Sequence, residues 1–182
     1  VDTVVEELWR KQNRPVDSLE HSVFLSGLNT FSKEYTGTFV TETMLVDGLN
    51  DSHDSLERTA SFIQSLHPEI AYISIPTRPP YEKWVKKPDE MHITQAHQLY
   101  TDAGLHTELI LGYEGSDVGF TGNPLDDVVG ICSVHPLRED ALLELLKKNQ
   151  ADPVILDILL QTDAIRKVSY QSHTYYIRSF KD

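Results

Sequence analysis

The segment from Phe39 to Pro80 constrains the fold more than any other part of this sequence. An apolar, β-branched run from Thr38 to Val46 ends in a turn rich in Gly, Asn and Asp. A segment with helical spacing follows, and a second apolar run, Ile70 to Ile75, ends in a proline-rich loop. This order predicts a β-loop-α-β-loop unit in which both loops follow the carboxyl ends of parallel strands. In barrels and open α/β sheets, that edge carries the ligand site.

The flanking sequence extends the same α/β pattern. Before the unit, the spacing predicts a helix over 4–12 and a longer helix that Ser18 caps. After it, the pattern predicts a helix over 89–103 and a third strand over 107–111. The glycine-rich stretch 112–124 is typical of a linker or a lid.

The character of the sequence changes after residue 124. Three amphipathic helices are predicted there, the last of them capped by Asp152, and a β-hairpin is predicted over 165–178. Three helices closed by a hairpin form a winged-helix-like plan. We therefore predict two domains, an α/β domain over 1–124 and a small helical extension over 125–182.

Charge and cysteine content exclude several classes of function. The net charge is −12, of which −10 falls in residues 1–124 and −2 in residues 125–182. An acidic surface repels phosphate and anionic lipid, so nucleic-acid and membrane binding are not expected. The sequence has no apolar run near the ~20 residues that a membrane span needs. Cys132 is the only cysteine, which excludes an intrachain disulfide and fits a cytoplasmic location.

Three short motifs resemble a known family. They are ETMLVDGLND (Glu42 to Asp51), WRKQNRP (Trp9 to Pro15) and IPTRPP (Ile75 to Pro80). With these motifs the chain resembles the C-terminal half of a radical S-adenosylmethionine (radical SAM) protein. It is most similar to a group of Fe–S oxidoreductases with a small helical extension that begins near SVHPLRE (Ser133 to Glu139).

The resemblance implies parallel (β/α) repeats that form half of a partial TIM-like barrel, followed by the winged-helix-like extension. The intact parent protein would use S-adenosylmethionine and a [4Fe–4S] cluster to form a 5′-deoxyadenosyl radical. The CxxxCxxC motif that holds the cluster in this family is absent here. The chain alone is therefore expected to bind no metal or cofactor, to carry no catalytic residue and to be inactive.

The same resemblance predicts what this chain contacts. Its first partner would be the N-terminal half of the barrel, which is missing here. The second would be a substrate, whose identity is unknown. Because missing strands leave a sheet edge exposed, self-association through that edge is also expected.

Two predicted cofactor-binding residues are associated with the first strands of the barrel half. In the family, a polar residue at the position of Asp2 contacts the ribose of S-adenosylmethionine, and a carboxylate suits two hydroxyls. The alternative is that Asp2 caps the helix that begins near Val4. Thr43 would face the barrel lumen and touch the cofactor, or it is a strand threonine packed in the core. Its neighbour Glu42 needs a partner or water for its charge.

Two further predicted cofactor-binding residues lie in the loops. Asn50 is at the position where adenine contacts occur in relatives, and an amide matches an adenine edge; the alternative is an ordinary turn asparagine. Arg78 follows the second strand and suits a carboxylate or phosphate, or it makes a surface contact.

A second function class stays open beside the enzyme. The chain would then be a non-catalytic α/β plus winged-helix-like module for protein or RNA docking. For residues 125–182 themselves, we expect a docking or lid role beside the barrel mouth, with Val134, Leu137 and Ile155 as candidate contacts. An independent phosphate-binding enzyme is a third hypothesis, which the lack of a glycine-rich fingerprint weakens.

Overall fold

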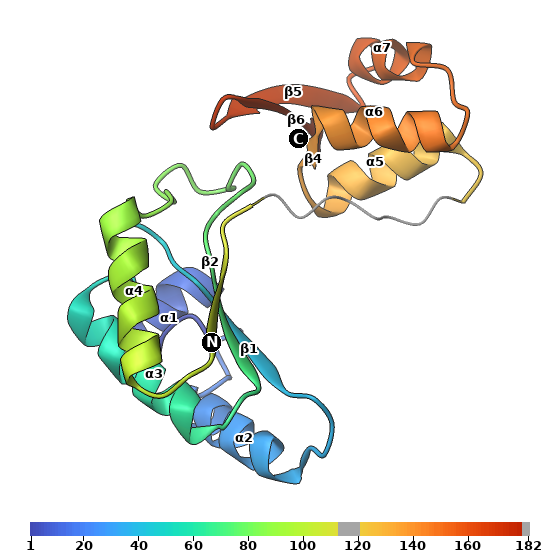
Figure 1. The fold of residues 1–182 in the computed structure, drawn as a ribbon. Coiled ribbons are helices and arrows are strands. Elements are labelled where there is room, and N and C mark those ends of the chain that lie inside the picture. The colour runs from blue at the N-terminus through green and yellow to red at the C-terminus, as the bar shows by residue number, and fades with distance from the viewer. Residues whose placement is uncertain (113–120, 180–182) are drawn as a thin grey trace. The chain divides into compact units, whose positions relative to one another are not determined.

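The computed structural model describes residues 1–112 and 121–179, which fall into two compact units (Figure 1). The first unit comprises residues 1–77 and 82–112, and the second comprises residues 78–81 and the chain after Gly112. Within the described ranges, no helix is long and apolar enough to cross a membrane.

The first unit is built on a parallel three-stranded sheet in the order β1-β2-β3. Its strands are β1 (Val40–Met44), β2 (Ile70–Ser74) and β3 (Thr107–Ile110). The β-branched and apolar runs of the sequence form these strands, so the predicted parallel α/β arrangement of this unit is confirmed.

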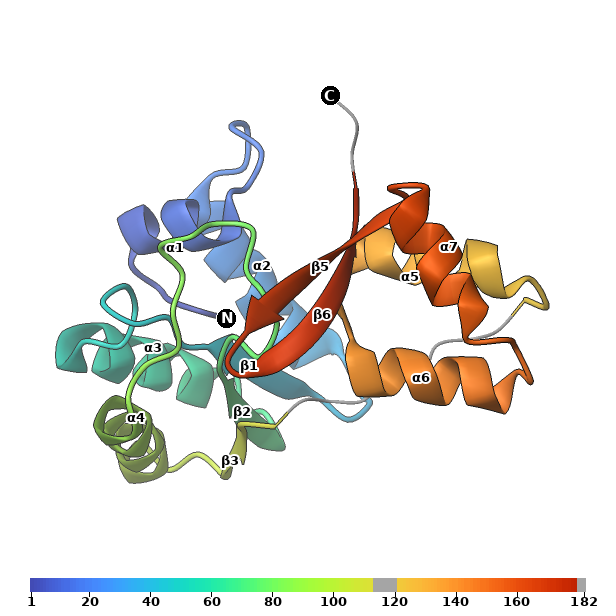
Figure 2. The same ribbon diagram turned by 90° about the horizontal axis from the view of Figure 1, so that it is seen from above.

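Two helices connect the strands and cover one face of the sheet (Figures 1 and 2). They are α3 (His53–Ser65), with Ser52 as N-cap, and α4 (Glu90–Asp102), with Asp89 as N-cap. The side chains of Ser52 and Asp89 accept hydrogen bonds from the first turns of these helices, which fixes where each helix begins. The buried core between helices and sheet consists of Leu45, Leu56, Ala60, Ile63, Ala71, Ile73, Ala96, Tyr100 and Leu105.

Two more helices, α1 (Glu6–Asn13) and α2 (His21–Glu34), precede the sheet. They pack through Trp9, which is buried and whose ring centroid lies 4.9 Å from that of His21 and 5.4 Å from that of Phe24. The prediction that Ser18 caps the second helix is wrong. A turn closed by the Leu19 N–H on the Val16 carbonyl occupies that position, so the helix begins later and no side chain caps it.

Over its described residues, 78–81 and 121–179, the second unit contains three helices and an antiparallel sheet in the order β4-β6-β5. Its elements in chain order are α5 (Pro124–Val134), β4 (Leu137–Arg138), α6 (Glu139–Lys148), α7 (Val154–Gln161), β5 (Ile165–Tyr170) and β6 (His173–Arg178). The core contains Val128, Ile131, Cys132, Leu137, Leu142, Leu145, Leu146, Leu159, Ile165 and Tyr176.

The C-terminal hairpin confirms the pattern seen in the sequence. Gln171 and Ser172 connect β5 to β6 with φ angles of 45° and 64°. Positive φ at both central positions suits the twist of a two-residue hairpin turn.

Two other predictions for this region, a docking contact at Leu137 and a linker or lid over 112–124, are not confirmed. Strand β4 was not predicted, and Leu137 within it is fully buried, so its prediction as a docking contact is wrong. The linker or lid expected over 112–124 lies largely outside the described residues.

Candidate functional site

The candidate site lies at the carboxyl ends of β1 and β2. These strands are adjacent and parallel, so the loops that follow them lie at the same edge of the sheet. The loops touch, since the Asp47 N–H donates to the Lys86 carbonyl at 3.0 Å. The edge predicted from the sequence is therefore formed by the segment after β1 and the longer segment that leads from β2 to α4.

Asn50 connects this loop to the first residues of the chain. Its Oδ1 accepts from the Val46 N–H at 2.8 Å, and its Nδ2 donates to the Asp2 carbonyl at 2.8 Å and to the Met44 carbonyl at 3.0 Å. The side chain is 1% exposed, and both amide hydrogens have protein partners. Asn50 thus holds the backbone at this edge, and its predicted adenine contact stays a prediction.

The Asp2 carboxylate lies against the outer edge of β1. Oδ1 accepts from the Met44 N–H at 2.9 Å, and Oδ2 accepts from Asn13 Nδ2 at 2.7 Å. The helix-capping alternative is wrong, because Val5 is the N-cap of α1 and no side chain caps that helix. A carboxylate has about four acceptor sites, so Asp2 retains acceptor capacity for a ligand.

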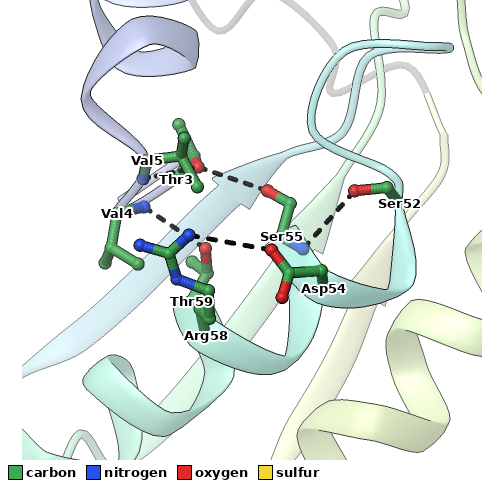
Figure 3. Close-up of polar contacts among 8 residues, drawn as sticks. All are labelled: Thr3, Val4, Val5, Ser52, Asp54, Ser55, Arg58 and Thr59. Atoms are coloured by element: carbon green, nitrogen blue, oxygen red, sulfur yellow. Dashed lines mark hydrogen bonds and ion pairs between the residues drawn. The ribbon is translucent and has the colours of Figure 1, made fainter.

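Buried hydroxyls fix the segment that carries Asp2, as Figure 3 shows. Thr3 Oγ1 and Ser55 Oγ lie 3.3 Å apart, and the Val4 N–H donates to Thr59 Oγ1 at 3.3 Å. All three hydroxyl side chains are buried. Satisfied hydrogen bonds between buried polar groups hold the segment against α3 in one position.

Thr43 contacts the helix layer. Its hydroxyl donates to the Val1 carbonyl at 2.8 Å and accepts from the Tyr100 hydroxyl at 3.0 Å. Thr43 is 1% exposed, and burial raises the pKa of Tyr100, which lies in the same core. The residue therefore matches the packed-strand alternative in its contacts, while its predicted cofactor contact stays a prediction.

The opposite face of the sheet carries polar side chains in one row. Glu42, Tyr72 and Glu108 are paired in register across the three strands, and alternation along a strand places them away from the α3 and α4 layer. Ser74 Oγ donates to Glu42 Oε1 at 2.6 Å. Glu42 is exposed, so its charge is stabilised by this hydroxyl and can also be solvated by water.

A histidine at the start of α4 belongs to the same edge. His92 Nδ1 lies 2.7 Å from Asp89 Oδ1, and this contact raises the pKa of His92, with smaller contributions from Asp51 and Asp47. The pKa of Asp89 is lowered first by the His92 backbone N–H, which donates to Asp89 Oδ1 at 2.8 Å, and then by the contact with the His92 ring. Asp89, Asp51 and Asp47 thus place negative charge near the start of α4.

Arg78 lies in the loop after β2, is half-buried, and belongs to the second unit. Within the first unit, the structure brings together Asp2, Thr43 and Asn50. Gln12 was missed: its Nε2 donates to the Met44 carbonyl at 2.8 Å. Its place in the WRKQNRP motif was the available signal.

The side chains of the described residues do not fit an iron–sulfur cluster. No three metal-ligating side chains of these residues gather at one place. The thiol of Cys132 is buried in the core of the second unit, and burial raises its pKa to about 12, which disfavours the thiolate that a cluster needs. By contrast, the accessible capacity of Asp2 suits a ligand that donates hydrogen bonds.

Parallel strands joined by helices place the first unit in the α/β class of folds. No protein-family model matches the chain. A UPF0026 protein of Methanocaldococcus jannaschii is 33% identical over 183 residues, which cover 100% of this chain and 57% of that protein. The chain thus spans a little over half the length of this relative.

Two solved structures are similar to part of the chain. One is a domain of pyruvate-formate lyase-activating enzyme from Bacteroides vulgatus, with 20% identity and a TM-score of 0.46, covering 60% of this chain and 63% of that domain. The other is a radical SAM methyltransferase from Sphaerobacter thermophilus, with 18% identity and a TM-score of 0.48, covering 62% of this chain and 33% of that enzyme.

Proposed function

We propose that this chain is part of a cytoplasmic radical SAM iron–sulfur enzyme and contributes one wall of its S-adenosylmethionine site. The observation that carries the proposal is the convergence of Asp2, Thr43 and Asn50 at the carboxyl end of β1. The sequence resemblance had identified these three residues as cofactor-binding, although they come from separate segments of the chain. A ligand edge at the carboxyl ends of parallel strands is also what this class of fold uses.

The three residues have different roles in the proposal. Asp2 binds the ribose hydroxyls, because its carboxylate is the least buried of the three groups. Asn50 fixes the backbone of the loop that lies beside the ligand, and Thr43 fixes the strand below it. The cluster requires thiolates from outside this chain, so the chain alone is expected to bind no stoichiometric cluster.

The test uses the full-length natural protein, purified without oxygen. We expect S-adenosylmethionine to bind and to be cleaved to 5′-deoxyadenosine in the presence of a reductant. Asp2→Asn keeps the shape of the side chain but removes its charge, and should weaken binding by roughly tenfold, the loss expected for one charge-assisted hydrogen bond. The matched control is Asp17→Asn in an exposed turn. A full-length protein that binds neither cluster nor S-adenosylmethionine would overturn the proposal.

A second candidate function rests on the order of elements in the second unit. Three helices, a short strand after the first of them, and an antiparallel sheet in the order β4-β6-β5 support a winged-helix-like module. We propose that this unit is a docking module and that it acts on proteins. The net charge of −2 over residues 125–182 disfavours nucleic acid. Salt-titrated binding to duplex DNA and RNA tests this point, and submicromolar affinity at physiological salt would contradict it.

A further inference from the structure

Helix α7 is more apolar than its burial explains. Six of the eight residues in its sequence, VILDILLQ, are apolar. A helix that is apolar on all sides is normally buried on all sides. Here only Leu159 is fully buried, while Val154 and Ile158 are 48% and 42% exposed. The helix therefore has more apolar surface than the core of its own unit covers.

The exposed apolar residues lie on one face. Val154 and Ile158 are four positions apart, so they are neighbours on the helix surface, and Asp157 and Gln161 are exposed beside them. We call these four residues the α7 face. The segment from Asp152 to Asp163 contains three aspartates and no lysine or arginine. Along its own segment, the α7 face is thus an apolar ridge flanked by aspartates, and the nearest element with bases is β5, where Lys167 is paired with Glu139.

The charge selects the occupant of this face. Phosphate backbones are excluded by repulsion, because the recognition helix of a DNA-binding module needs bases where α7 has acids. A second copy of this chain is also acidic, with a net charge of −12. In a two-fold contact between α7 faces, the same aspartates would meet each other.

We propose that the α7 face binds an amphipathic helix of a separate, basic protein, with apolar side chains against Val154 and Ile158 and Lys or Arg beside Asp157. Amphipathic helices pair through apolar residues three or four positions apart, the spacing of Val154 and Ile158. Opposite charge at the border speeds association and suppresses wrong partners. The inference goes beyond the proposed enzyme function and does not depend on it.

The test uses a fluorescently labelled model peptide of leucine and lysine that forms an amphipathic helix, and its leucine–glutamate counterpart. Anisotropy is measured with the whole chain at physiological salt. The double variant V154S/I158S should lose at least about tenfold in affinity for the basic peptide, since two apolar contacts are removed. Leu143→Ser on α6 is the matched control, because Leu143 is also 48% exposed. Asp157→Asn should weaken binding and reduce its salt dependence.

Each outcome decides the proposal. Equal binding of the acidic peptide, or an equal loss with Leu143→Ser, would show that the contact is a non-specific apolar one and would overturn it. Sedimentation that reveals dimers broken by V154S/I158S would assign the face to a second copy. Competition by duplex DNA would assign it to nucleic acid. All substituted residues are solvent-exposed, and circular dichroism verifies that each variant is folded.

Discussion

In the part of the chain that the structure describes, the two outer edges of the parallel sheet differ in whether their backbone N–H and C=O groups have hydrogen-bond partners. Several backbone groups on the outer edge of β1 have partners: the Val1 nitrogen donates to the Glu42 carbonyl at 2.6 Å, and Asp2, Gln12 and Asn50 bind the groups of Met44. On the outer edge of β3, no further strand pairs among the described residues. There Leu109 and Leu111 are 40% and 43% exposed.

The difference teaches how an edge strand is protected. Polar side chains can bind the backbone groups of an edge strand, and on β1 an amide, a carboxylate and a second amide do so. An edge without such groups presents N–H and C=O groups that template pairing with another chain. The self-association expected from the sequence is therefore a proposal that we assign to the β3 edge.

The largest expected effect comes from removing the central group of the β1 edge. Asn50→Ala leaves the Val46 N–H and two carbonyls without their partner in a buried position. We expect the first unit to lose about 3 kcal/mol of unfolding free energy, from more than one unsatisfied group. Urea denaturation followed by tryptophan fluorescence measures this unit, because Trp9 and Trp84 both lie in it. Asn13→Ala, which removes one exposed bond, is the control and should cost under about 1 kcal/mol.

A smaller effect is expected where β1 meets the helix layer. Thr43→Val removes the acceptor of the Tyr100 hydroxyl, and should cost about 2 kcal/mol because that hydroxyl is buried. Tyr100→Phe should cost about 1 kcal/mol, and the double variant should cost less than the sum of the two. The same urea assay gives the three values. Strict additivity would mean that the hydroxyl pair does not stabilise this contact.

The open edge gives a prediction about association. If β3 is the pairing edge, Leu109→Lys should weaken self-association of the chain by about tenfold, since an edge lysine blocks strand pairing. Val40→Lys on β1 is the matched control, because Val40 is 43% exposed. Sedimentation equilibrium measures both variants. A monomeric wild-type chain at high concentration, or an equal effect of Val40→Lys, would remove the distinction between the edges.

The smallest effect concerns the loops at the carboxyl edge. Because Asp89 raises the pKa of His92, the folded state favours the protonated imidazole. The resulting stability is fully present below the ordinary pKa of about 6.5 and is lost as pH rises through the raised folded value. Proton NMR of the imidazole should show the pKa of His92 above its ordinary value, and Asp89→Asn should lower it. Asp102→Asn, at the other end of α4, should leave it unchanged.

The sequence predicted the parallel strands because β-branched runs and capped helices are local signals. Strands β1, β2 and β3 lie within two residues of their predicted ends. The start of α2 was predicted too early, because a turn near Ser18 competes with the helix cap. Strand β4 has only two residues, and its pairing with β6 is a long-range contact that no local pattern encodes.

The candidate site was predicted less completely. The resemblance selected Asp2, Thr43 and Asn50, but it did not show that the protein itself uses most of their hydrogen-bonding groups. Such partners come from segments far apart in the sequence. The pairing of Ser74 with Glu42 is of the same kind, since only the register of β1 and β2 brings them together. Glu42 is exposed, so water can also solvate its charge, and no local pattern identifies Ser74 as its partner.

Because the thiol of Cys132 is buried, its reactivity reports on the opening of the second unit. Cys132 is 5% exposed and is the only cysteine of the chain. A thiol reagent therefore reacts only with molecules whose second unit has opened, and the labelling rate measures the frequency or population of that opening. Tryptophan emission follows the first unit over the same time course. One sample thus yields two rates, the labelling rate of Cys132 and the rate of change of tryptophan emission. Comparing them reveals whether the two units unfold together or one after the other.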